Sequence, residues 1–446
     1  MQKRQPGPRS HHRWRLLASF IAAAMLAACG TSNASPRPTS TPTVTQTPTQ
    51  PLAHLTVYAT ADSGILRALK ADTGQLRWQG QTGQLAGGTP VVENGIIYAG
   101  SFHTVYAFKA SDGGLLWSTQ GYNPPTGPLV ADGKVFVDYY TTETDGSVTI
   151  SVAALKGADG SQLWSKQVVT HSTQAPPTPG TFGQLAANGA FYVAVLSAVA
   201  SNTRPAQFLL YAFNASDGKL LWRSSGTFAQ GESATLLAEN GVVFVYVDRL
   251  YAYKASSGTL LWQAQGASQP LTGPNGGHDL LVHQGTVYVA TNDGLTAYST
   301  DNGSRLWQVP VDSSLGQFME ITLANGVIYA TQADGASALD VRTGKLHWSY
   351  KANRQFAGFL APLTDRDTLY ISNFMSGLLA LDIHTGNLRW QAQAGGNGIR
   401  PILVDGTLFV GGGDGVITAI RASDGRILWR FPTNGGMSFP AALTIA

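Results

Sequence analysis

Apolar residues recur along this chain in short runs, and each run is followed by a turn that contains glycine. A large apolar residue follows an alanine in nine places, as expected for a half-buried strand that ends near the glycine. Nine tryptophans have this alanine ten residues before them and a glycine four residues before them: Trp78, Trp117, Trp164, Trp222, Trp262, Trp307, Trp348, Trp390 and Trp429. Their spacings are 39, 47, 58, 40, 45, 41, 42 and 39 residues, which indicates a repeated supersecondary unit.

Each repeat predicts two short hairpins. One has a tight turn such as Asp112-Gly113, where the glycine adopts positive φ without strain. The other, Pro90 to Tyr98, turns at Asn94-Gly95 and recurs upstream of the later tryptophans. Four antiparallel strands per unit, in units of about 44 residues (395 residues from Leu52 onward divided by nine), predict the blades of an all-β closed β-propeller.

The two ends of the repeat region predict how the ring closes. Residues Leu55 to Tyr58 have the pattern of a second strand with no first strand before it, whereas Pro440 to Ala446 has the register of a first strand. We therefore expect the C-terminal strand to pair with Leu55 to Ala59 and complete the first blade, which removes two exposed sheet edges. This count gives nine blades, and an eight-bladed ring with one displaced unit is the alternative.

The nine tryptophans are predicted to dock each blade onto its neighbour. A buried indole removes about 150–250 Å² from water, so one per unit contributes substantially to blade packing. The alternative is that they line a ligand cleft, but a ligand site does not require nine copies.

A resemblance follows from these residues. The stretch Ala338 to Trp348 reads Ala-Leu-Asp-Val-Arg-Thr-Gly-Lys-Leu-His-Trp and resembles the tryptophan-docking motif of the PQQ-type propeller repeat. The stretch Ala380 to Trp390 departs from that motif only by Asn387 in place of Lys. The resemblance covers about residues 52–446 and implies a PQQ-like propeller domain over 54–446. The family includes quinoprotein dehydrogenases and BamB-like lipoproteins, so the resemblance implies the fold and not the chemistry.

The N-terminal region predicts export and lipidation. Residues 1–28 contain five basic residues followed by the apolar run Leu16 to Ala28, the pattern of a signal peptide. The sequence Leu26-Ala27-Ala28-Cys29 resembles a bacterial lipobox, so Cys29 is predicted to be lipidated; an ordinary signal peptide with an incidental cysteine is the alternative. Residues 29–53 then form a Thr/Ser/Pro-rich disordered tether. The protein is expected to be extracytoplasmic and anchored to the cell membrane.

Cysteine content and charge exclude several classes of function. Cys29 is the only cysteine, so a disulfide within the chain and a two-cysteine haem site are impossible. The formal charge of +3 includes five Lys/Arg in residues 1–28; removing them leaves 24 basic against 26 acidic residues, or −2. This balance gives no basic patch for nucleic acid.

Strand alternation places the turns between first and second and between third and fourth strands on one face, named here the first face. The remaining turns and the inter-blade loops lie on the second face. The insertions Thr141 to Ser147, Val168 to Gly183, Ala198 to Gln207 and Gly266 to His278 all map to the second face, and long loops on a rigid scaffold point to recognition. Its candidate binding residues are Tyr122, His171, Phe228, His278, Phe318, Glu320, Arg354, Phe356, Asn397 and Arg400.

Two functions are consistent with this pattern. The first is a lipid-anchored scaffold similar to BamB, which holds a protein or small-ligand partner on the second face and needs no cofactor or metal. His278 and His283 have no nearby carboxylate cluster in the sequence that would suggest a metal site. The alternative is a PQQ-dependent dehydrogenase with calcium, or a sugar-binding or hydrolytic propeller. Methanol-dehydrogenase-like members stack the quinone against a disulfide between adjacent cysteines, which this chain lacks, so the sequence favours a binding protein.

Overall fold

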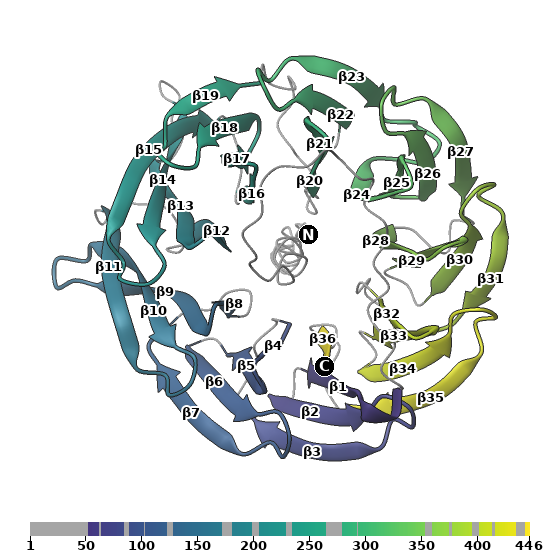
Figure 1. The fold of residues 1–446 in the computed structure, drawn as a ribbon, viewed down its shortest axis with the longest axis horizontal. Helices are drawn as coiled ribbons and strands as arrows, with labels where there is room; N and C mark the ends of the chain where they lie inside the picture. Colours follow the sequence, from purple (N-terminus) through teal and green to yellow (C-terminus); the bar gives the residue numbers. More distant parts are fainter. Residues whose placement is uncertain are drawn as a thin grey trace, which may run out of the picture.

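A computed structural model describes residues 52–61, 64–83, 89–101, 103–122, 128–171, 181–198, 205–228, 234–264, 279–291, 293–352, 359–373, 377–394, 401–412, 415–433 and 442–446. These residues form the short 3-10 helix η1 (Leu52–His54) and strands β1 to β36. The strands make nine separate four-stranded antiparallel sheets, arranged as blades in a ring (Figure 1). The nine-blade prediction is confirmed, and the eight-bladed alternative is wrong.

Each blade uses four strands in order from the centre of the ring outward (Figure 1). The innermost strands are β36 (Ala442–Ile445), β4 (Val91–Glu93), β8 (Leu129–Ala131), β12 (Thr181–Ala187), β16 (Thr235–Glu239), β20 (Asp279–His283), β24 (Phe318–Ala324), β28 (Phe359–Thr364) and β32 (Ile402–Val404). The second strands are β1 (Thr56–Ala61), β5 (Ile96–Gly100), β9 (Lys134–Thr142), β13 (Ala190–Ala198), β17 (Val242–Tyr246), β21 (Thr286–Thr291), β25 (Val327–Gln332), β29 (Thr368–Asn373) and β33 (Thr407–Gly411).

The outer half of each blade continues the same order. The third strands are β2 (Ile65–Lys70), β6 (Thr104–Lys109), β10 (Val148–Lys156), β14 (Ala206–Asn214), β18 (Leu250–Lys254), β22 (Gly294–Ser299), β26 (Gly335–Asp340), β30 (Leu378–Asp382) and β34 (Val416–Arg421). The outer strands are β3 (Leu76–Gln81), β7 (Leu115–Gln120), β11 (Gln162–His171), β15 (Leu220–Phe228), β19 (Leu260–Gln263), β23 (Arg305–Pro310), β27 (Leu346–Lys351), β31 (Leu388–Ala392) and β35 (Ile427–Pro432).

The first blade is completed by the end of the chain, as predicted. Strand β36 pairs with β1, with Val57 opposite Ile445 and Thr60 opposite Ala442. The amide of Thr56 also donates to the carbonyl of Ala446 at 2.8 Å. Ring closure therefore joins residues from opposite ends of the chain within one sheet.

The tryptophans and glycines of the repeat meet across the seams between blades. We number the blade of β36 and β1–β3 as blade 1 and the others in chain order, so that β24–β27 form blade 7 and β28–β31 form blade 8. Trp348 of blade 7 lies against Gly386 of blade 8, where an added Cβ would stand 2.5 Å from the indole. Gly386 also has a φ of 74°, so this position favours glycine both for its backbone and for its lack of a side chain. All nine repeat glycines contact the tryptophan of the preceding blade in the same way. Each repeat tryptophan therefore lies in the seam between two blades.

A hydrogen bond accompanies this contact in eight seams. The indole N–H donates to the carbonyl three residues before the glycine, at 2.7 to 3.1 Å, in the pairs Trp78–Ala110, Trp117–Gly157, Trp164–Ala215, Trp222–Ala255, Trp262–Thr300, Trp348–Ile383, Trp390–Ala422 and Trp429–Ala71. At the remaining seam, the Tyr288 hydroxyl donates to the equivalent carbonyl of Val341 at 3.2 Å. The indole Nε1 of Trp307 has no hydrogen-bond partner among the described residues.

Each outer strand contains a β-bulge beside its tryptophan. In blade 7, Ala338 lies opposite Trp348 and Leu339 opposite Leu346, so the intervening His347 has no partner across the pair. The same register shift occurs in all nine blades. The bulge turns the tryptophan into the seam and leaves the two residues before it on the outside of the ring. No α-helix capable of crossing a membrane occurs in the part of the chain that the structure describes.

Candidate binding face

The two faces of the ring differ in the length of their hairpins. On the first face, tight two-residue turns such as Asn94-Gly95 use positive φ at both positions, 52° and 76°. On the second face, the hairpins β9–β10 and β13–β14 consist of strands of nine residues each. The second, third and outer strands of the other seven blades have only four to six residues, as those of blade 7 illustrate. Blades 3 and 4 therefore extend beyond their neighbours on the second face.

The tip of the β9–β10 hairpin is ordered by its own hydrogen bonds. The amide of Glu143 donates to the carbonyl of Ser147 at 2.8 Å, and the amide of Gly146 donates back to Glu143 at 2.9 Å. The Asp145 carboxylate accepts from the Ser147 amide at 2.8 Å; hydrogen bonds from Ser147 lower the pKa of Asp145. The tip thus presents a polar turn closed by hydrogen bonds. Tyr140 lies just before it and is 39% exposed.

Tyrosines hold the long strands of blades 3 and 4 against the next blade. The Tyr211 hydroxyl in blade 4 donates to the carbonyl of Val168 in β11 at 2.6 Å. In blade 5, the Tyr253 hydroxyl donates to Ser225 of β15 at 2.9 Å, and the Tyr251 hydroxyl donates to Thr227. Burial raises the pKa of Tyr253, so the Tyr253 hydroxyl stays a protonated donor at neutral pH. The extended edges of blades 3 and 4 are therefore fixed from one side.

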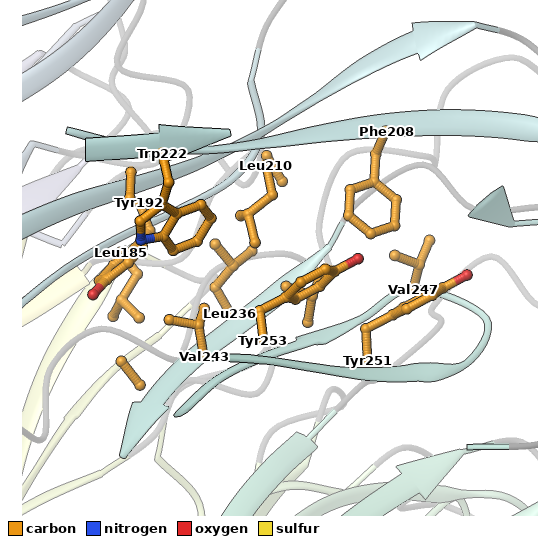
Figure 2. Packing of buried hydrophobic residues seen from close by; sticks show 14 of the residues in the cluster. Leu185, Tyr192, Phe208, Leu210, Trp222, Leu236, Val243, Val247, Tyr251 and Tyr253 are labelled. Carbon is orange, nitrogen blue, oxygen red and sulfur yellow. The ribbon is translucent and has the colours of Figure 1, made fainter. Parts of the chain in front are cut away.

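A large apolar cluster supports the same region. Figure 2 shows the rings of Tyr251 and Tyr253 side by side beneath Phe208; the two tyrosine rings are stacked, with centroids 6.0 Å apart. Gly226 of β15 provides room, because a Cβ there would lie 2.4 Å from the Phe208 ring. The cluster spans the seam between blades 4 and 5. Close packing of large rings at this seam gives blades 4 and 5 a well-packed base beneath the β13–β14 hairpin.

Blade 7 has a different arrangement at this face. Gln332 is 1% exposed and Ser337 is 3% exposed, and the serine hydroxyl donates to the glutamine oxygen at 2.5 Å. The glutamine amide donates onward to the carbonyl of Gly316 at 3.4 Å. These bonds tie β25 and β26 to the connection between blades 6 and 7. Because their bonding groups are used internally, we assign these buried polar side chains a structural role.

Two of the predicted binding residues lie at the second face in defined contacts. Tyr122 is half-buried and packs edge-on against Tyr139, with ring centroids 5.4 Å apart. Its hydroxyl donates to the Gln162 side chain at 3.3 Å. Glu320 is 9% exposed, and both its amide and its carbonyl bond the Thr331 hydroxyl at 3.2 Å. Tyr122 borders the accessible surface, whereas Glu320 is largely enclosed.

The structure corrects two other predictions. Phe228 and Phe318 are each only 2% exposed. Phe228 packs in the seam cluster of blades 4 and 5, and Phe318 packs in the corresponding cluster of blades 6 and 7. Both side chains belong to the core and present no surface to a partner, because the apolar positions of strand ends continue the seam packing.

The remaining predicted residues are not placed by the structure. His171 lies in β11, where its backbone is opposite Val148, but its side chain is outside the described residues. The rest of the predicted set also falls outside the described residues: His278, Arg354, Phe356, Asn397 and Arg400.

Sequence reasoning missed the residues that make the second-face hairpins distinctive. Tyr139 donates or accepts a bond with the Ser165 hydroxyl at 2.6 Å, and Tyr140 is exposed beside it. The signal was present in the long polar and aromatic stretch that follows Val137. Its importance depends on the strand length, which is fixed only by pairing with β10.

Across the described ranges, no three His, Cys, Asp or Glu side chains lie close enough to hold a metal ion.

Residues 61–194 and 206–431 match the family described as outer membrane protein assembly factor BamB. The chain belongs to the BamB family. It is 24% identical over 341 residues to the protein of that description from Yersinia pestis, covering 71% of this chain and 79% of the relative. The corresponding protein of Moranella endobia (strain PCIT) is 26% identical over 341 residues, covering 71% and 70%.

A solved structure supports the architecture. The computationally designed Ika8 protein superimposes with a TM-score of 0.52 and 13% identity, covering 76% of this chain and 93% of that protein. This similarity concerns the propeller fold alone.

Proposed function

We propose that this BamB-family chain is an extracytoplasmic, lipid-anchored scaffold that binds a partner protein on its second face. The observation that carries this proposal is the pair of extended hairpins on blades 3 and 4. Their strands are longer than those of the other blades, and no apolar core requires the extra length at the tip, since residues 141–146 are all exposed.

Rigidity makes these hairpins suited to recognition. A partner that docks on preformed strands avoids most of the entropic cost of ordering a loop. Tyr211 and Tyr253 fix the outer strands from the adjacent blades, and Tyr140 supplies an exposed aromatic ring. Aromatic rings on a rigid polar platform are common in protein–protein interfaces.

Partner binding on the second face is tested with a variant in which one hairpin is shortened. Replacing residues 142–146 by Asn-Gly removes the β9–β10 tip and leaves the blade core intact. Partners cross-linked to the wild-type protein in native membranes are identified, purified and titrated against both forms. We expect at least tenfold weaker binding by the shortened form. The matched control replaces Ser111 and Asp112 on the first face, where binding should be unchanged. Equal affinity of the shortened and wild-type proteins would contradict the proposal.

The anchor is tested separately at Cys29. The lipobox-like sequence before it predicts diacylation of its thiol, and Cys29→Ser should abolish this modification. Mass spectrometry of the N-terminal peptide from membranes checks the prediction. An unmodified mature N-terminus in the wild-type protein would refute lipid anchoring without affecting the partner test.

A further inference from the structure

Exposed apolar side chains are concentrated at the start of the outer strands, and they occur there in all nine blades. Of the thirteen large hydrophobic residues exposed in the described part of the chain, all except Tyr140 are leucines one or two positions before a repeat tryptophan. They lie where the outer strands begin, next to the turns of the first face. Adjacent pairs occur in blades 2, 4 and 5, and we name these six residues the leucine rim: Leu115, Leu116, Leu220, Leu221, Leu260 and Leu261.

The β-bulge explains why these leucines face solvent. In blade 4, Trp222 lies opposite Ala212 and Leu220 opposite Phe213, so Leu221 has no partner across the pair. The leucines of the rim are between 44% and 56% exposed. Their strands β7, β15 and β19 follow one another around the circumference, with β11 between the first two (Figure 1). Leu163 of β11 is 43% exposed and continues the arc through blade 3.

The chain enters the ring beside this arc. The carbonyl of Ala53 in η1 accepts a bond from the Arg77 guanidinium at 3.4 Å, and Arg77 adjoins the exposed Leu76 of blade 1. The amide of Ala71 donates to the carbonyl of Leu55 at 3.2 Å. Residue 52 therefore lies at the first face of blade 1, the blade next to blade 2 of the leucine rim. The second face, with its long hairpins, lies on the opposite side of the ring.

The short span to Cys29 limits how far this face can move from a membrane. Leu52 is 23 residues after Cys29 (52 − 29). The tether that composition predicts for residues 29–53 would have an average end-to-end distance of about 25–30 Å. A lipid attached to Cys29 would therefore hold the first face, together with the leucine rim, within reach of the bilayer surface.

The net charge of the segments that carry the exposed leucines of blades 1 to 5 is compatible with contact to lipid headgroups. The turn-to-tryptophan segments of blades 1 to 5 contain six Lys/Arg and four Asp, a balance of +2, over residues 70–78, 109–117, 156–164, 214–222 and 254–262. Lys109 and Lys156 pair with Asp112 and Asp159 at 2.8 and 2.6 Å, while Lys254 has no acidic residue in its turn. Leucines flanked by lysines form the composition typical of interfacial membrane contacts.

We infer that the leucine rim is a lipid-contact surface that seats the first face on the bilayer and turns the second-face hairpins away from it. This inference rests on the lipid anchor proposed above. The partner-binding hairpins would then be presented at a fixed height and orientation, and the acyl chain and the rim would act as two membrane signals on one molecule.

The test measures depth in the membrane at defined positions of the full chain. Leu221→Cys adds one thiol to the leucine rim, and Leu163→Cys adds one to the exposed leucine of blade 3 that lies between rim residues of blades 2 and 4. Thr144→Cys adds a matched thiol at the second-face tip of blade 3. Each protein is labelled with an environment-sensitive dye in vesicles of phosphatidylethanolamine and phosphatidylglycerol that contain a spin-labelled lipid. We expect quenching at both rim positions to be at least twice that at Thr144. Replacing Leu220 and Leu221 together with Ser should reduce the quenching at Leu163→Cys.

The possible results distinguish the lipid-contact inference for the leucine rim from the proposal that Cys29 is lipidated. Acylated Cys29 with equal quenching at the rim and the tip would overturn the rim inference and leave the anchor standing. Strong rim quenching with unmodified Cys29 would support the rim and reject the anchor. Rim thiols that cross-link two copies of the chain, with no lipid quenching, would identify a second copy as the occupant and overturn the lipid assignment. Two independent rim positions keep the test decisive if one variant does not fold.

Discussion

The contact between Trp348 and Gly386 allows a direct test of what holds neighbouring blades together. Gly386→Ala would place a methyl group 2.5 Å from the indole Cε3, whereas carbon atoms in contact are about 3.5–4.0 Å apart. Blades 7 and 8 would have to separate by roughly 1 Å or the indole would have to rotate out of its hydrogen bond to Ile383. Such overpacking costs about 1–3 kcal/mol, in addition to about 1–2 kcal/mol for a side chain at positive φ.

Gly406 provides the matched control. Its φ of 69° is close to the 74° of Gly386, but an added Cβ would meet no atom within 4 Å. Gly406→Ala should therefore cost only the backbone contribution, about 1–2 kcal/mol, while Gly386→Ala should cost about 2–5 kcal/mol. Urea unfolding followed by circular dichroism gives both values, and similar slopes with urea confirm that the comparison is valid.

A double-mutant cycle then isolates the indole. Trp348→Ala alone should cost about 3–5 kcal/mol, as expected for loss of a buried tryptophan, and it removes the atoms that the new methyl group would strike. In that background, Gly386→Ala should fall to the cost of Gly406→Ala, which gives a coupling energy of about 1–3 kcal/mol. If Gly386→Ala and Gly406→Ala cost the same in the wild-type protein, or if the indole makes no difference, the docking explanation is wrong.

Three further predictions concern closure, acid stability and the seam tyrosines. Deleting residues 442–446 should lower the urea midpoint or cause aggregation, because β36 pairs with β1 and buries Leu443; a midpoint equal to that of the intact chain would refute closure. Hydrogen bonds from Lys156 and Ser161 lower the pKa of Asp159 to about 2, so its stabilising effect is present above the unfolded pKa of about 4 and is lost as pH falls toward 2; Asp159→Asn should flatten this part of the pH–stability curve. Tyr253→Phe should cost about 0.5–1.5 kcal/mol and speed amide exchange in β15, and unchanged exchange there would show that its bond to Ser225 does not fix that edge.

The sequence was sufficient to predict the repeat unit, the nine blades and the closing strand. These features depend on local rules: alternating apolar positions fix the strands, and Asn-Gly or Asp-Gly pairs fix the turns. The closing strand was predictable because Pro440 to Ala446 repeats the register of Pro90 to Glu93. The extracytoplasmic anchor at Cys29 also comes from the sequence and remains a prediction.

The tertiary structure alone determined which repeat residues meet. Each tryptophan follows a glycine by four residues in sequence, but it packs against the glycine of the next blade, as Trp348 does with Gly386. Packing between blades also explains the errors at Phe228 and Phe318. Strand periodicity assigns a residue to one side of a blade, but its burial depends on how far the adjacent blade covers that side. The leucine rim became visible for the same reason, since its exposure arises from a bulge in strand pairing. Local patterning therefore determined the blades, and packing between blades determined the surface available to a partner.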